Sequence, residues 1–156
     1  MTLLEQAIAF REAYDQEMLD GMVRYGFVKE KLFDMQAGLV EEEANEFLEA
    51  CKDLRDAANT PANHFEVLKE LSDLVFVCYQ FAAAYGLDLD TAMQRVYESN
   101  MSKLDDDGKP IYREDGKVLK GPNYRKPKLD DLIPLGQIHY DTSGKWCKKL
   151  KQIQTI

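Results

Sequence analysis

The chain has 156 residues and a formal net charge of −8, from 20 basic and 28 acidic side chains. This length suits one domain with its own core and excludes two large ones. The acidity argues against a nucleic-acid partner. Nucleic-acid binding is favoured by positive side chains, which neutralise phosphates and release the counterions condensed on them. The longest apolar run, residues 74–85, is interrupted by Gln80 and too short to cross a bilayer, so no membrane partner is expected.

The cysteines and the first residues indicate the compartment. Cys51, Cys78 and Cys147 are far apart and form no paired spacing, which is typical of reduced thiols. Residues 1–5 lack a basic region followed by an apolar core, so no signal peptide is expected. We therefore predict a cytoplasmic protein.

The first two helices are predicted from the spacing of apolar side chains. Residues 2–18 show a helical period, and Thr2 with Glu5 forms a capping-box pattern at its start. Two glycines predict a loop over residues 19–30. A second helix then runs from Lys31 or Gln36 to residue 56.

A third helix is predicted from residue 61 to about residue 85. Thr60 is its expected N-cap, and Pro61 suits the first helical position, where its missing N–H costs nothing. Gly86 is expected to end it in a left-handed conformation. It is the most hydrophobic segment, so it should lie at the centre of a bundle.

A fourth helix, capped by Asp88 or Asp90, is predicted over residues 91–103. Four helices of this kind predict an all-α protein, built as a four-to-five-helix bundle. Residues 1–104 would form this helical domain, and the chain changes character after them.

Residues 105–156 predict a small β-hairpin and an extended tail. Residues 111–119 form the hairpin, with Asp115 and Gly116 as its two-residue loop. Residues 144–153 fit either a short helix or a strand. We expect this tail to pack on the helical body or on a neighbouring subunit.

Two acidic pairs lie inside predicted helices. Glu43 and Glu46 are three residues apart, as are Glu70 and Asp73, so each pair shares a helical face. Such pairs are commonly solvated charges that bind Lys or Arg, but Lys69 is expected to point elsewhere round its helix. Carboxylates crowded in a low-dielectric interior repel one another, unless Mg²⁺ or Mn²⁺ shares their oxygen ligands. The two pairs together therefore predict a metal site.

The same segments resemble a known family. Residues 40–50 and 68–75 are similar to the two acidic motifs of the MazG-like all-α nucleoside triphosphate pyrophosphohydrolases. Residues 99–103 and 113–124 are similar to the tail of phage-type members, and the resemblance extends from about residue 5 to residue 130.

The resemblance implies a catalytic domain that hydrolyses (deoxy)nucleoside triphosphates to the monophosphate and pyrophosphate. It implies two or three Mg²⁺ ions per active site, for which Mn²⁺ can substitute, held by Glu43, Glu46, Glu70 and Asp73. Glu42 or Glu46 would accept the proton of the attacking water, and the sequence does not choose between them. Family members form dimers or tetramers, so a homo-oligomer is expected. Some phage-type members act on dGTP and GTP, which favours a role in the nucleotide pool of a phage, in the host cytoplasm.

Substrate contacts are predicted at two places. The fourth helix would bind sugar and phosphates through an amide and an ammonium. The tail would close over the nucleotide, from the same or a neighbouring subunit. Two aromatic side chains one helical turn apart would stack on the base, although such spacing more often marks a core. These residues are Asn100, Lys103, Lys117, Lys120, Asn123 and Tyr124, with Phe10 and Tyr14 for the base.

Two other functions stay open at this point. A phosphoribosyl-ATP pyrophosphohydrolase would use the same helical scaffold on a bulkier nucleotide. A non-catalytic helical oligomer would use its acidic face to bind Mg²⁺ or a basic partner.

Overall fold

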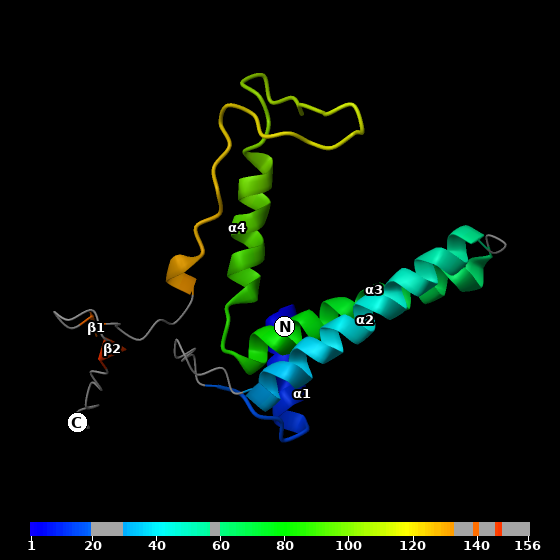
Figure 1. Ribbon diagram of the computed structural model, residues 1–156, viewed down its shortest axis with the longest axis vertical. Coiled ribbons are helices and arrows are strands. Elements are labelled where there is room, and N and C mark those ends of the chain that lie inside the picture. The colour runs from blue at the N-terminus through cyan, green and yellow to red at the C-terminus, as the bar shows by residue number, and fades with distance from the viewer. Residues whose placement is uncertain (20–29, 57–59, 133–138, 141–145, 148–156) are drawn as a thin grey trace.

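The computed structural model describes residues 1–19, 30–56, 60–132, 139–140 and 146–147. These residues are mostly helical, which confirms the all-α prediction (Figure 1). The elements in chain order are α1 (Leu3–Ala13), α2 (Glu30–Asp56), α3 (Pro61–Ala84), α4 (Leu89–Met101), the 3₁₀ helix η1 (Asp130–Leu132), β1 (His139–Tyr140) and β2 (Trp146–Cys147).

The start of α1 has the predicted capping box. The hydroxyl of Thr2 accepts a hydrogen bond from the Glu5 amide at 3.2 Å, and the Glu5 carboxylate accepts one from the Thr2 amide at 2.7 Å. The helix ends at residue 13, earlier than predicted, because Asp15 adopts the left-handed region with φ 51°. Most of the loop predicted over residues 19–30 lies outside the described residues.

Helices α2 and α3 form a long antiparallel pair, which is the main body of the fold (Figure 1). The start of α3 is as predicted: the Thr60 hydroxyl accepts from the Asn63 amide at 3.4 Å, and Pro61 occupies the first turn. Its end is also as predicted, with Gly86 in the left-handed region at φ 61°. These end signals are local in sequence, and they fix where α3 begins and ends.

The core lies at one end of this pair, where α1 packs against α3. Ala7 of α1 is buried against Tyr79 and Ala83 of α3, and small alanine side chains let the two helices approach closely. A second buried cluster joins Leu32 of α2 to Tyr85 at the end of α3. The third helix is therefore central, because both α1 and α2 pack on it.

A buried polar network crosses the same end. The Arg11 side chain is fully buried, and its guanidinium donates to the side-chain oxygens of Gln36 at 3.3 Å and Gln80 at 3.4 Å. Gln80 in turn donates to the carbonyl oxygen of Ala7 at 3.2 Å. Burial lowers the pKa of Arg11, and the nearby charge of Glu17 opposes that effect. The network thus ties three helices together with polar contacts.

Helix α4 leaves the α2–α3 pair at its base and points away from it (Figure 1). Asp88 caps it, since its carboxylate accepts from the Thr91 amide at 3.0 Å, which is one of the two caps predicted. Met101, the last residue of α4, is 48% exposed. The C-terminal end of α4 lies away from the middle of the α2–α3 pair (Figure 1).

The predicted hairpin over residues 111–119 is reduced to one bridge between Tyr112 and Val118. Its predicted two-residue loop is wrong. The Arg113 amide donates to the Lys117 carbonyl at 2.8 Å, so three residues form the turn, and Gly116 takes a φ of 83°. A left-handed glycine at the end of a three-residue turn is a common hairpin geometry.

Residues 121–131 run back along α4 as a strap (Figure 1). The Ser99 hydroxyl donates to the Arg125 carbonyl at 2.7 Å, and the Arg125 amide donates to the Ser102 hydroxyl at 2.9 Å. The Arg95 guanidinium makes two hydrogen bonds to the Asp131 carboxylate. One face of α4 is thereby covered by its own tail. Of the segment 144–153, residues 146–147 form β2, which pairs antiparallel with β1, and the rest lies outside the described residues.

Candidate metal centre

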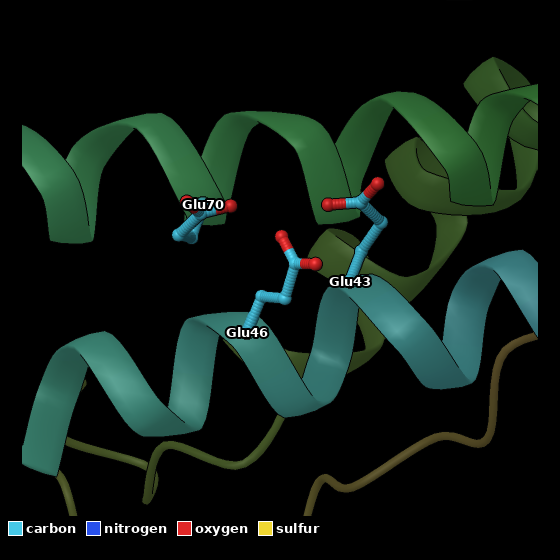
Figure 2. Close-up of side chains that lie close together, drawn as sticks. All are labelled: Glu43, Glu46 and Glu70. Atoms are coloured by element: carbon cyan, nitrogen blue, oxygen red, sulfur yellow. The ribbon is translucent and has the colours of Figure 1, made fainter.

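Three carboxylates meet between α2 and α3 (Figure 2). Glu43 and Glu46 extend from α2 toward Glu70 of α3, and one oxygen of each lies within 4.8 Å of the other two. The spacing of three residues places Glu43 and Glu46 on the face of α2 that packs against α3. We call these residues the carboxylate trio.

Glu70 is the buried member of the trio. Its side chain is 6% exposed. One of its oxygens, Oε2, is buried, and no described residue gives it a hydrogen bond. A buried carboxylate oxygen without a donor is costly and calls for an explanation, such as an ion that the site is built to hold. This orphaned oxygen is the strongest sign that the trio takes a ligand.

Charge repulsion acts on Glu43. Partial burial raises the pKa of its carboxyl group, and the charges of Glu46, Asp73, Glu70 and Glu42 raise it further, in that order. The neighbouring carboxylates thus make the ionised form of Glu43 less favourable. A bound cation would remove this repulsion.

The expectation that Lys69 points away from the acidic pair is wrong. Its ammonium lies 2.7 Å from a carboxylate oxygen of Glu70 and 3.2 Å from one of Asp73. It holds the pKa of Glu70 below its usual range. The lysine side chain is long and flexible, so its ammonium can contact both the next residue and the residue one helical turn later.

Asp73 stands at the edge of the trio. Its side chain is 45% exposed, and it is paired with Lys69. It is close enough to raise the pKa of Glu43. Asp73 therefore belongs to the same electrostatic site, although the compact group of ligand oxygens consists of the trio.

The donor set fits a hard divalent cation. All three members of the trio offer carboxylate oxygens, which suit Mg²⁺ and Mn²⁺. The orphaned Oε2 of Glu70 supplies a ligand atom that is already desolvated. Glu42, the alternative proton acceptor, is exposed on α2 and lies outside the trio.

The predicted substrate residues on α4 are not beside the trio. Asn100 is exposed and Lys103 is half-buried, both at the C-terminal end of α4. Helix α4 points away from the α2–α3 pair (Figure 1), so the predicted role of these two residues in substrate binding stays a prediction. The chain turns at Gly86, with φ 61°, and Asp88 then starts α4 in its new direction.

The predicted tail residues are largely occupied by local contacts. The Asn123 amide group donates to the Asp106 carboxylate at 2.7 Å. The Lys120 ammonium lies 4.4 Å from the centre of the Tyr124 ring, a cation–π contact. Lys117 is exposed next to the hairpin turn. These contacts stabilise the tail near the end of α4.

The two predicted aromatic residues belong to a cluster of three. The rings of Phe10 and Tyr14 lie 4.4 Å apart, and Phe10 meets Phe76 of α3 edge-on at 5.4 Å. Tyr14 is 67% exposed. Phe76 was not predicted, although it follows Asp73 by three residues and so shares its helical face. The cluster lies one turn along α3 from Asp73.

A separate cavity of about 390 Å³ lies between α4 and the strap. Arg95, Ser99, Arg125 and Lys128 are among the residues that line it, and none of the predicted site residues does. It is thus distinct from the trio.

Comparison with known proteins gives one family. Residues 24–100 match the model of the phosphoribosyl-ATP pyrophosphohydrolase family, and this segment contains the whole trio. That family belongs to the superfamily of MazG-like all-α pyrophosphohydrolases that the acidic motifs resemble. The match indicates an enzyme that acts on a nucleotide as a pyrophosphohydrolase. No curated protein matches the chain. Among the described helices, none is both long and apolar enough to cross a membrane.

Proposed function

We propose that this protein is a Mg²⁺-dependent nucleoside triphosphate pyrophosphohydrolase, which converts a (deoxy)nucleoside triphosphate and water to the monophosphate and pyrophosphate. One observation carries the proposal. The trio gathers three carboxylates from two helices around a buried Glu70 oxygen that no described residue satisfies. The family match supports a pyrophosphohydrolase and leaves the substrate open.

The carboxylates would divide two tasks. Glu43, Glu46 and Glu70, joined by Asp73, would hold the cations. Bound Mg²⁺ would neutralise the triphosphate, polarise the α phosphorus and lower the pKa of an attacking water. The proton of that water needs an acceptor with a free lone pair. Glu42 is favoured over Glu46 for this role, because it is exposed beside the trio and is not one of its members.

The base would contact the same chain, whereas the sugar and phosphates would contact a neighbouring one. The aromatic cluster of Phe10, Tyr14 and Phe76 offers a stacking surface for a base near the carboxylates. Asn100, in the last turn of α4, and Lys103, two residues after its end, would bind sugar and phosphate, and α4 points away from the α2–α3 pair (Figure 1). We infer that they serve the trio of a neighbouring subunit.

Exposed apolar side chains support a homo-oligomer, a dimer or a tetramer. Phe65 and Leu68, one turn apart on α3, are 69% and 63% exposed, and Leu48 of α2 is 62% exposed. Large exposed apolar patches mark association surfaces. Sedimentation equilibrium tests this, and a protein that remains monomeric at assay concentration would refute the shared site.

The main test is a panel of substrates with Mg²⁺ or Mn²⁺, in which pyrophosphate release is followed. The panel includes all canonical NTPs and dNTPs, with dGTP and GTP as the expected preferred substrates if the chain serves a phage nucleotide pool. Glu70→Gln should abolish release. Glu49→Gln, an exposed carboxylate on α2 outside the trio, is the matched control and should leave it unchanged.

Phosphoribosyl-ATP is the second candidate substrate, because the matching family model is named for it. It shares the bond that is cleaved, so the same trio would act on it. Adding it to the panel separates the two. Turnover of phosphoribosyl-ATP with inert NTPs would assign that activity instead, and no pyrophosphate from any substrate would remove both.

A further inference from the structure

The ammonium of Lys69 lies where a cation is needed. It is 2.7 Å from Glu70 and 3.2 Å from Asp73, so it bridges two of the four predicted metal ligands. Lys69, Glu70 and Asp73 are all on α3, and the ammonium reaches both carboxylates from the side chain's exposed position, at 57% exposure.

The bridge satisfies the site only in part. Lys69 contacts one oxygen of Glu70, while the other, Oε2, stays buried without a hydrogen bond from any described residue. Glu43 and Glu46 have no such counter-charge among the ion pairs that the described residues form. One positive charge therefore faces four carboxylates, and the remaining negative charge still favours a divalent cation.

We propose that Lys69 is the internal counter-cation of the metal-free site, and that its ammonium leaves Glu70 and Asp73 when a divalent cation binds there. This inference rests on the proposed metal site. It adds a role for a residue outside the ligand set: Lys69 keeps the carboxylates together before the metal arrives, and it competes with the metal for them.

The exchange is inexpensive for the protein. The ammonium of Lys69 is exposed, so water solvates it once it leaves, and the metal ion would replace it at the buried carboxylate of Glu70. The lysine stem is long and flexible, so the ammonium can turn toward solvent, or toward the phosphates of a substrate, without any change in α3. A divalent ion brings two charges and can also bind Oε2 of Glu70, which the ammonium leaves alone.

Removal of the competitor gives a measurable prediction. In Lys69→Met, the metal no longer displaces an ammonium, so Mn²⁺ should bind roughly twofold to fivefold more tightly in calorimetry, the upper part of the range expected from an ion pair whose ammonium is exposed. The metal-free variant should also melt below the wild type, since its carboxylates then repel one another without a counter-charge.

Loss of a positive charge anywhere strengthens cation binding slightly, so the control must remove the same charge elsewhere. Lys52→Met does so: Lys52 is exposed on α2 and makes no ion pair with the described residues. Its affinity for Mn²⁺ should change by less than about twofold, because distant exposed charges are screened. Equal affinities of Lys69→Met and Lys52→Met would overturn the inference.

A direct readout uses the unaltered protein. With ¹⁵N-labelled lysine, the Nζ signal of Lys69 should shift when diamagnetic Mg²⁺ is added, while that of Lys52 stays in place. An unmoved Lys69 signal at saturating Mg²⁺ would overturn the exchange even though the metal binds. If neither wild type nor Lys69→Met binds metal, the metal site itself is refuted together with the inference. If only Lys69→Met binds, the competition is supported.

Discussion

The backbone amide of Gly121 donates a hydrogen bond to the carbonyl oxygen of Lys103 at 2.9 Å. This contact brings the strap against the residues that directly follow α4. It is possible because residue 121 has no side chain: a Cβ there would lie 2.5 Å from the Lys103 oxygen and 2.7 Å from the Leu104 oxygen. The position of Lys103 therefore depends on a glycine eighteen residues later in the chain.

Gly121→Ala should detach the strap from the end of α4. Both oxygens belong to the backbone and cannot rotate away, so we expect destabilisation of about 1–3 kcal/mol, as for other overpacked sites. Chemical denaturation measures it, and faster hydrogen exchange of the residue 121 amide locates it. A variant with the stability of the wild type and an unchanged amide would show that the close contact does not exist in solution.

Gly38→Ala is the matched change with the opposite sign. Gly38 lies inside α2, and a Cβ there would meet nothing within 4 Å. Alanine should stabilise the protein by about 0.5–1 kcal/mol, because it lowers the backbone entropy lost on folding. The melting temperature should rise. A fall would mean that this face of α2 is covered by a second subunit.

The titration of Glu43 should make the metal-free protein less stable as the pH rises. Its pKa is raised in the folded state, so its contribution to stability is full below its ordinary value of 4.5 and is lost as pH rises through the raised pKa. Glu43→Gln should abolish that loss. At neutral pH it should stabilise the protein by roughly 0.2–0.5 kcal/mol for each like-charge repulsion that it removes.

Unfolding free energies of wild type and Glu43→Gln between pH 4 and 8 measure this effect, with Glu49→Gln as the exposed control.

Glu70 has the opposite effect, because Lys69 lowers its pKa. Its contribution to stability is present above its ordinary pKa and is lost as pH falls through the lowered pKa. A stability curve for Glu43→Gln that is parallel to that of the wild type would contradict the repulsion.

Gln80→Leu should cost about 1–3 kcal/mol, because it leaves part of the buried Arg11 guanidinium without its acceptor. It also removes the donor to the Ala7 carbonyl. Thermal unfolding measures the loss. Gln6→Leu, at an exposed position of α1, is the control and should change stability little. Similar melting temperatures for both variants would show that the network is not stabilising.

The helices could be predicted because their end signals are local. Thr2, Thr60 and Asp88 each accept a hydrogen bond from an amide three residues later, and Gly86 ends α3 by its own conformation. The early end of α1 could not be predicted from spacing, because it depends on a left-handed Asp15, which is less favoured there than glycine.

The arrangement of the site was less accessible to sequence reasoning. Periodicity predicts which residues share a helical face, so Glu43 and Glu46 could be paired, as could Glu70 and Asp73. It says nothing about the direction in which α4 leaves α3, and hence it could not place Asn100 or Lys103. It also treats arginine as exposed, whereas Arg11 is buried where three helices meet.

The uneven support of the α2–α3 pair has a dynamic consequence. Helix α1 packs at the end that contains Tyr79 and Ala83, and the trio lies farther along, toward Thr60. Amides near Glu46 and Glu70 should therefore open and exchange with solvent sooner than those near Ala83. An ion held jointly by both helices would slow that opening, so protection from hydrogen exchange would report occupancy of the site before any substrate is added.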